Sequence, residues 1–161
     1  AALYVTDGRS ATRRAAETGV ADTVLIDLAF DYATAGRIAV AAAEQCRPAA
    51  LAAAVGLLQA AGMAVSRFAD VPGLTVMRTV AMLANEAADA VNQGVCSETA
   101  ADSAMRLGVN YPLGPLAWAD LIGAENVCNV LANLGNCYGE DRYRASPLLA
   151  RKVFSGKKFH V

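Results

Sequence analysis

The residue types that carry most enzymatic chemistry are scarce in this chain. It has one histidine, His160, close to the C-terminal end, and four cysteines at positions 46, 96, 128 and 137. No two cysteines stand in a Cys-x-x-Cys spacing, and one histidine cannot complete a zinc site with them. We therefore expect no metal site. We also expect free thiols in a cytoplasmic protein, and a tail position without a catalytic role for His160.

The glycines offer no dinucleotide-binding turn either. A Gly-x-Gly-x-x-Gly sequence, which lets a backbone approach a pyrophosphate, occurs nowhere in the 161 residues. The formal net charge of −1 gives no electrostatic case for nucleic acid or an anionic membrane surface. The weakly charged stretch 49–65 is too short for a membrane span and contains Gln59 and Gly62, so we interpret it as a buried helix.

The first seventy residues have the rhythm of a small α/β layer. Short apolar runs that are typical of strands alternate with segments that can form helices, and a strand, a helix and a strand in this order predict a parallel crossover unit. Hydrophobic residues make up 55% of the chain and many are alanine, which favours close helix packing. The predicted strands are 3–6, 23–27, 37–42 and 64–68, and the predicted helices are 10–18 and 48–61.

One long helical pattern organises the rest of the chain. We expect it to begin at Asp70 as a capping residue, to hold Pro72 in its first turn, and to end at Gly94. Four further helices follow, near 97–107, 116–122, 125–138 and 147–154. The expected organisation is a partial Rossmann-like α/β segment at 1–70 and a five-helix domain at 71–161.

Two ordered sets of residues make the helical part recognisable. The first is Asp70-Val-Pro-Gly73, then an arginine, Asn85-Glu-Ala87 and Gly94-Val95. The second is Tyr111-Pro-Leu-Gly-Pro115 with the residues on either side of it. Together they strongly resemble the C-terminal domain of the L-3-hydroxyacyl-CoA dehydrogenases, and most of all the 3-hydroxybutyryl-CoA dehydrogenases of phenylacetate degradation. The resemblance implies a helical domain like the C-terminal domain of 6-phosphogluconate dehydrogenase. Long bacterial members carry a second copy of this domain, which we expect this chain to represent.

The resemblance implies oxidation of the 3-hydroxyl of an acyl-CoA by NAD. A histidine removes the hydroxyl proton, a glutamate orients that histidine, and both belong to a dinucleotide-binding domain that has no counterpart here. One catalytic residue of the family, an asparagine directly before an arginine, does belong to the helical domain. The matching position is Met77, followed by Arg78. Because methionine has no amide to hydrogen-bond a substrate, we expect no catalysis by this copy.

Other residues are candidates for a substrate cleft or for an interface between subunits. Arg78 could face an acyl-CoA or another subunit, or bond locally to helix carbonyls or Glu86. Asn85 and Glu86 are expected to be a buried pair that fixes the helix to a neighbouring loop. Gly114 is expected to supply an unusual backbone angle, Pro115 to begin a helix, and Asp120 to pair or cap locally.

These patterns predict a piece of an NAD-dependent 3-hydroxyacyl-CoA dehydrogenase whose first residue, Ala1, lies almost inside a strand. The piece would form a homodimer through its helical domain, with the long central helix and the segment 112–134 as the candidate interface. It would help wall the acyl-CoA cleft, but would bind no NAD itself. Two alternatives stay open. The chain could be a stand-alone acyl-CoA-binding module, or the helical part of an enzyme like the 3-hydroxyisobutyrate dehydrogenases.

Overall fold

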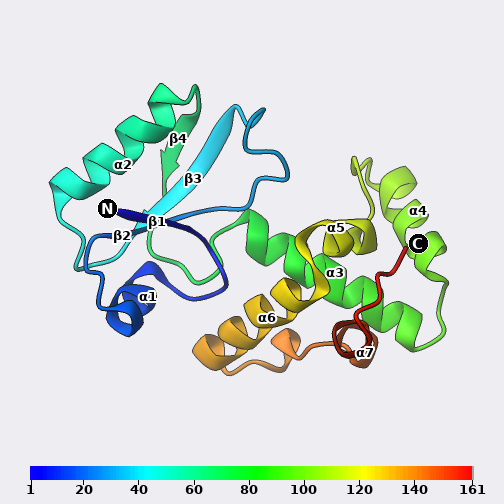
Figure 1. The fold of residues 1–161 in the computed structure, drawn as a ribbon. Helices are drawn as coiled ribbons and strands as arrows, with labels where there is room; N and C mark the ends of the chain where they lie inside the picture. The colour runs from blue at the N-terminus through cyan, green and yellow to red at the C-terminus, as the bar shows by residue number, and fades with distance from the viewer. Residues whose placement is uncertain (161) are drawn as a thin grey trace. The chain divides into compact units, whose positions relative to one another are not determined.

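The computed structural model describes residues 1–160, which form two compact units (Figure 1). The first unit spans Ala1–Arg78 and the second begins at Thr79. The first contains a four-stranded sheet with two helices, and the second is helical. The predicted class, a small α/β layer followed by a five-helix domain, is confirmed.

The sheet of the first unit has the strand order β1-β2-β3-β4. Strands β1 and β2 run parallel, as do β3 and β4, so each pair joined by a helix forms the expected crossover unit. The two pairs meet at the antiparallel contact between β2 and β3, which the sequence did not indicate. The elements are β1 (Ala2–Val5), α1 (Ala11–Thr18), β2 (Thr23–Ile26), β3 (Arg37–Ala42), α2 (Pro48–Ala60) and β4 (Ala64–Arg67).

Helices α1 and α2 cover opposite faces of this sheet. Successive strand residues point to opposite faces, so Leu25 packs in a cluster with Ala11 of α1, whereas Val24 packs in a cluster with Ala54 and Leu58 of α2. Leu25 and Val24 are both completely buried. The uninterrupted apolar run of β2 therefore fits a strand covered on both faces, as its sequence predicted.

The long helix α3 (Val76–Asn92) begins later than expected, and Asp70 is not its cap. The two oxygens of Asp70 instead accept hydrogen bonds from Ala11 N (2.6 Å) and Thr12 N (2.8 Å), at the start of α1. Ser10 accepts a third bond there, as predicted, from Arg13 N. A turn with positive φ at Gly73 and Leu74 separates Asp70 from α3, so this segment cannot continue the helix.

The second unit is built around the rest of α3. One face of this helix carries Ala81, Ala84 and Ala88, all at 0% exposure, so neighbouring elements can approach its backbone closely. Positive φ at Gly94 ends the helix, as predicted. The remaining elements are α4 (Glu98–Gly108), α5 (Pro115–Ile122), α6 (Ala124–Tyr138), the 3-10 helix η1 (Asp141–Tyr143) and α7 (Pro147–Ser155). Within residues 1–160, no helix is long and apolar enough to cross a membrane.

Candidate functional site

Met77 lies in the first turn of α3 and is 5% exposed. Its backbone N–H donates to the Oδ1 atom of Asp27 at 2.9 Å. The Oδ2 atom of the same carboxylate accepts from Thr75 N (2.9 Å) and Val76 N (2.8 Å). Asp27 is completely buried, so these backbone donors compensate the burial of its charge. Asp27 therefore fixes the start of α3, where Met77 presents an apolar side chain instead of an amide.

Of the predicted pair on α3, only Asn85 fixes a loop. It is 4% exposed, its Nδ2 donates to Arg144 O at 3.0 Å, and its Oδ1 accepts from Ser146 N at 2.7 Å. Both partners lie in the segment between η1 and α7, so the amide ties this segment to α3. Glu86 is exposed, and the expectation that it is buried beside Asn85 is wrong. One position along a helix turns a side chain by about 100°, which carries Glu86 out of that contact.

Gly114 and Pro115 form the start of α5, together with Asp102 of α4. Pro115 is the first residue of α5, as predicted. The φ of Gly114 is −77°, so the expected unusual backbone angle is absent. Glycine is required there for a different reason: a Cβ atom would lie 2.0 Å from Asp102 Cγ. Asp102 occupies that space because its oxygens accept from Leu116 N (2.8 Å) and Ala117 N (2.9 Å).

The tail after α7 returns to α4 and α5 and is anchored by two aspartates. Asp120 accepts from the backbone N–H groups of Phe159 (2.8 Å) and His160 (2.9 Å), so the expectation that it acts locally is wrong. The Nε2 atom of His160 lies 2.8 Å from Asp102 Oδ2. Phe159 is 4% exposed and Lys152 Nζ lies 5.0 Å from its ring centroid. His160 is therefore part of an anchored tail, and its aspartate partner is already bound to the start of α5.

The described residues thus place the six predicted site residues in different local contacts. Met77 lies beside Asp27, Asn85 contacts the segment before α7, and Gly114 and Pro115 contact Asp102. Arg78 is half-buried on α3. Sequence reasoning assigned no contact to Asp27 or Asp102, and it expected Asp70 and Asp120 to act locally. A general signal existed, since an aspartate is a preferred helix cap, but the N–H groups that they bind at the helix starts and in the tail lie 14 or more residues away in sequence.

Reactive groups of other kinds are few in the described part of the chain. Residues 1–160 contain no cluster of three or more histidine, cysteine, aspartate or glutamate side chains placed to hold a metal ion. Burial raises the pKa of the Cys128 thiol, and burial together with Asp22 raises that of Cys46. A raised pKa lowers the thiolate fraction at neutral pH, so these two thiols are poor nucleophiles.

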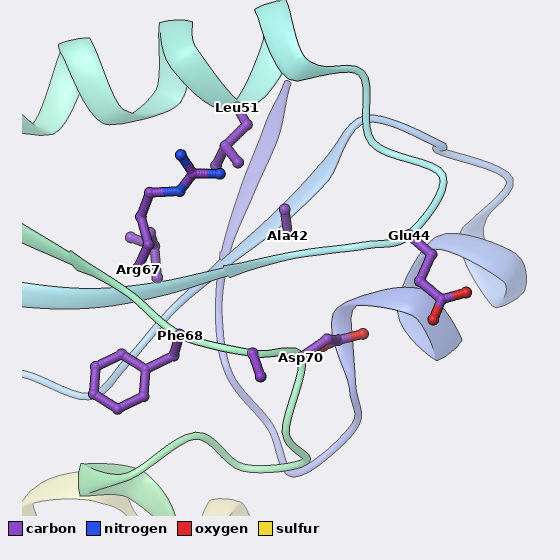
Figure 2. A pocket seen from close by; sticks show the side chains of 8 residues that line it. Ala42, Glu44, Leu51, Arg67, Phe68 and Asp70 are labelled. Atoms are coloured by element: carbon purple, nitrogen blue, oxygen red, sulfur yellow. The ribbon is translucent and has the colours of Figure 1, made fainter.

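The α/β unit also contains a cavity of about 320 Å³ where β3 and β4 end (Figure 2). Its lining includes Glu44, Leu51, Arg67, Phe68 and Asp70. Ligands of α/β folds bind beyond the carboxyl ends of parallel strands, and this cavity has that location. Sequence patterns did not indicate this cavity, because its lining comes from three separate segments, 40–44, 51 and 67–70.

Two protein-family models together match nearly the whole chain. Residues 3–72 match the 3-hydroxybutyryl-CoA dehydrogenase reduced Rossmann-fold domain, and residues 73–159 match the 3-hydroxyacyl-CoA dehydrogenase C-terminal domain. Both matches favour the predicted family over that of the 3-hydroxyisobutyrate dehydrogenases.

Curated and solved relatives agree with this assignment. A 3-hydroxyadipyl-CoA dehydrogenase of Escherichia coli is 47% identical over 74% of this chain and 25% of its own length. A probable 3-hydroxybutyryl-CoA dehydrogenase of Deinococcus radiodurans is 40% identical over 54% of this chain and 31% of its own. The crystal structure of a 3-hydroxybutyryl-CoA dehydrogenase from E. coli matches with a TM-score of 0.89 and 41% identity, over 96% of this chain and 32% of that one. The chain thus spans about a quarter to a third of these relatives, and it belongs to the 3-hydroxyacyl-CoA dehydrogenase family.

Proposed function

We propose that this chain is a non-catalytic part of an NAD-dependent 3-hydroxyacyl-CoA dehydrogenase. In this proposal it completes the acyl-CoA cleft of the enzyme and supports its assembly through the helical unit. The observation that carries the proposal is the environment of Met77. At the position of the family's catalytic asparagine, the chain places a methionine whose side chain is buried and whose backbone is bound by Asp27.

The residues at the start of α1 do not fit a dinucleotide. In a dinucleotide-binding turn, the first N–H groups of the helix after the first strand bind the pyrophosphate. Here the corresponding groups, Ala11 N and Thr12 N, both donate to the Asp70 carboxylate. A second anion at this helix start would meet the charge of Asp70 and find these donors already used. The turn before the helix also has only one glycine, Gly8, with Asp7 beside it.

The test is a titration of NADH with the purified 161-residue chain, followed by NADH fluorescence, and an assay of acetoacetyl-CoA reduction. We expect no saturable NADH binding in the micromolar range and no turnover above a buffer blank. A full-length 3-hydroxybutyryl-CoA dehydrogenase run in parallel is the positive control. Met77→Asn, which restores the family's amide, should stay inactive, because no histidine–glutamate pair accompanies it.

Saturable NADH binding or turnover by the unmodified chain would contradict the proposal. The alternative of a stand-alone acyl-CoA-binding module makes a different prediction for the same sample. If butyryl-CoA raised the melting temperature of the chain in a dose-dependent way and free butyrate did not, that alternative would replace the proposed role.

A further inference from the structure

A groove that contains one cationic side chain, Arg67, runs between α2 and β4 in the α/β unit. The cavity at the ends of β3 and β4 has a volume of about 320 Å³, and a second hollow of about 370 Å³ adjoins it along α2. Leu51 and Arg67 line both of them, so the two hollows share these two side chains. We call the two hollows together the α2–β4 groove.

The wall of the groove that α2 forms is apolar, and the side-chain amide of Gln59 lies at its end. Pro48, Leu51, Val55 and Gln59 are separated by three or four positions, so they form one stripe along the helix. Leu51 and Val55 are half-buried, and Phe68, which lines the adjoining cavity, is 48% exposed. A short aliphatic chain lying along this stripe would remove apolar surface from water on both itself and the protein.

Arg67 differs from five other arginines of the α/β unit, all of which have polar partners in the protein. Arg9, Arg13, Arg14 and Arg47 form ion pairs, and Arg37 donates to Ser66 Oγ at 3.0 Å. Within residues 1–160, the guanidinium of Arg67 has no protein hydrogen bond or ion-pair partner. Figure 2 shows it reaching from the end of β4 toward Leu51 on α2. An unpaired guanidinium beside an apolar wall is complementary to an anion with an apolar body.

Two carboxylates line the cavity at the end of β3, and they limit the charge of that anion. The oxygens of Asp70 are bound by the start of α1, which offsets its charge. Glu44 is exposed and is separated from Arg67 in Figure 2. The hollow along α2 has Arg67 as its one charged residue. The single positive charge of Arg67 matches a monoanion. A phosphate dianion would carry a second negative charge, which the carboxylate of Glu44 would repel.

We propose that the α2–β4 groove binds a small aliphatic monocarboxylate. Arg67 receives the carboxylate through its planar pair of N–H donors, and the Gln59 amide can donate a further hydrogen bond. The aliphatic chain lies against Leu51 and Val55. This site is independent of the proposed role of the chain in the dehydrogenase, and nothing in it involves Met77 or the helical unit.

The test is a titration of the ¹⁵N-labelled 161-residue chain with hexanoate, followed by amide chemical shifts. The amides of Leu51, Val55, Gln59 and Phe68 should shift together and saturate, with a dissociation constant on the order of 1 mM for so small a ligand. Hexanamide keeps the chain and removes the charge, and inorganic phosphate keeps an anion and removes the chain. Both should bind at least about tenfold more weakly.

Arg67→Gln should weaken hexanoate binding by about tenfold or more, because the charge-assisted contact is lost. Arg37→Gln is the matched control, since Arg37 lies on the adjacent strand and does not line the groove; its affinity should stay within about twofold of the original. If Arg67→Gln failed to fold, as judged by circular dichroism, Arg67→Lys would take its place and should retain partial binding.

Three results would overturn the proposal: no saturation, equal affinity for hexanamide or phosphate, or unchanged affinity in the Arg67 variant. The same amides could also shift with protein concentration in the absence of ligand. That result would assign the groove to a second copy of the chain and would equally overturn the carboxylate site. None of these outcomes bears on the NADH and turnover assays.

Discussion

At the residue scale, Asp102 has three partners in two other parts of the helical unit, the start of α5 and the C-terminal tail. Its carboxylate binds two N–H groups at the start of α5 and lies 2.8 Å from the His160 ring. It approaches α5 so closely that only glycine fits at position 114. The motif residue Gly114 is therefore explained by packing against a carboxylate, and not by chemistry on a substrate.

Gly114→Ala should lower the free energy of unfolding by at least about 2 kcal/mol, because the new Cβ displaces Asp102 and breaks its bonds to α5. Gly108→Ala in α4 is the matched control, since an added Cβ there meets nothing within 4 Å. The control should change stability by less than about 1 kcal/mol, towards greater stability. Urea unfolding midpoints measure both, and equal midpoints for the two variants would refute the packing explanation.

At the element scale, the starts of three helices are fixed by aspartates from other segments. Asp70 binds the start of α1 from 58 and 59 residues away, and Asp27 binds the residues at the start of α3 from 48 to 50 residues away. Asp102 binds the start of α5 from 14 and 15 residues away. A negative charge at a helix start satisfies N–H groups that the helix cannot bond internally and interacts favourably with the helix dipole. Each contact therefore fixes the start of a helix against the segment that supplies the aspartate.

Asp27→Asn should destabilise the chain by roughly 2–4 kcal/mol, because an amide has one acceptor oxygen and turns an NH₂ group towards backbone donors. Asp31→Asn is the control. Asp31 is exposed and accepts only nearby bonds, from Ala33 N and Thr34 Oγ1, so its variant should lose less than about 0.5 kcal/mol. Thermal unfolding of both variants at pH 7 measures the difference. A loss of similar size in the two would mean that Asp27 is not the anchor of α3.

At the scale of the whole molecule, the helical unit leaves large apolar side chains in contact with solvent. Leu121 is 64% exposed on α5, and Phe154 is 89% exposed on α7. The sequence predicts an interface on the long central helix, α3, and on the segment 112–134. Leu121 lies within that segment, and Phe154 lies outside both. Because burying such side chains against a second copy is favourable, the chain by itself should form a two-fold dimer.

The predicted dimer should bury about 1,200 Å² or more and be visible by analytical ultracentrifugation at micromolar concentration. Leu121→Glu should shift the population towards monomer by placing a charge in the interface, whereas Phe154→Glu should not. If Phe154→Glu alone dissociated the dimer, the interface would lie on α7. A single species of monomer mass across the dilution series would remove assembly from the proposed function.

The local patterns of the sequence were sufficient for the elements and the class of the fold. Apolar runs of four to six residues indicated the four strands, and helical spacing indicated α3. The ordered motifs gave the family, which the comparisons confirm. These features were predictable because each depends on neighbours within a few positions, or on residue order alone.

Tertiary structure decided which groups the polar residues bind. Asp70 precedes a helix and resembles its cap, yet its oxygens bind the start of α1 instead. Asp120 binds a tail about forty residues away, Gly114 makes room for a carboxylate, and Arg67 meets α2 only because β4 ends there. A carboxylate bonds whichever N–H groups the packed chain brings within about 3 Å, and sequence spacing does not encode that distance for residues far apart.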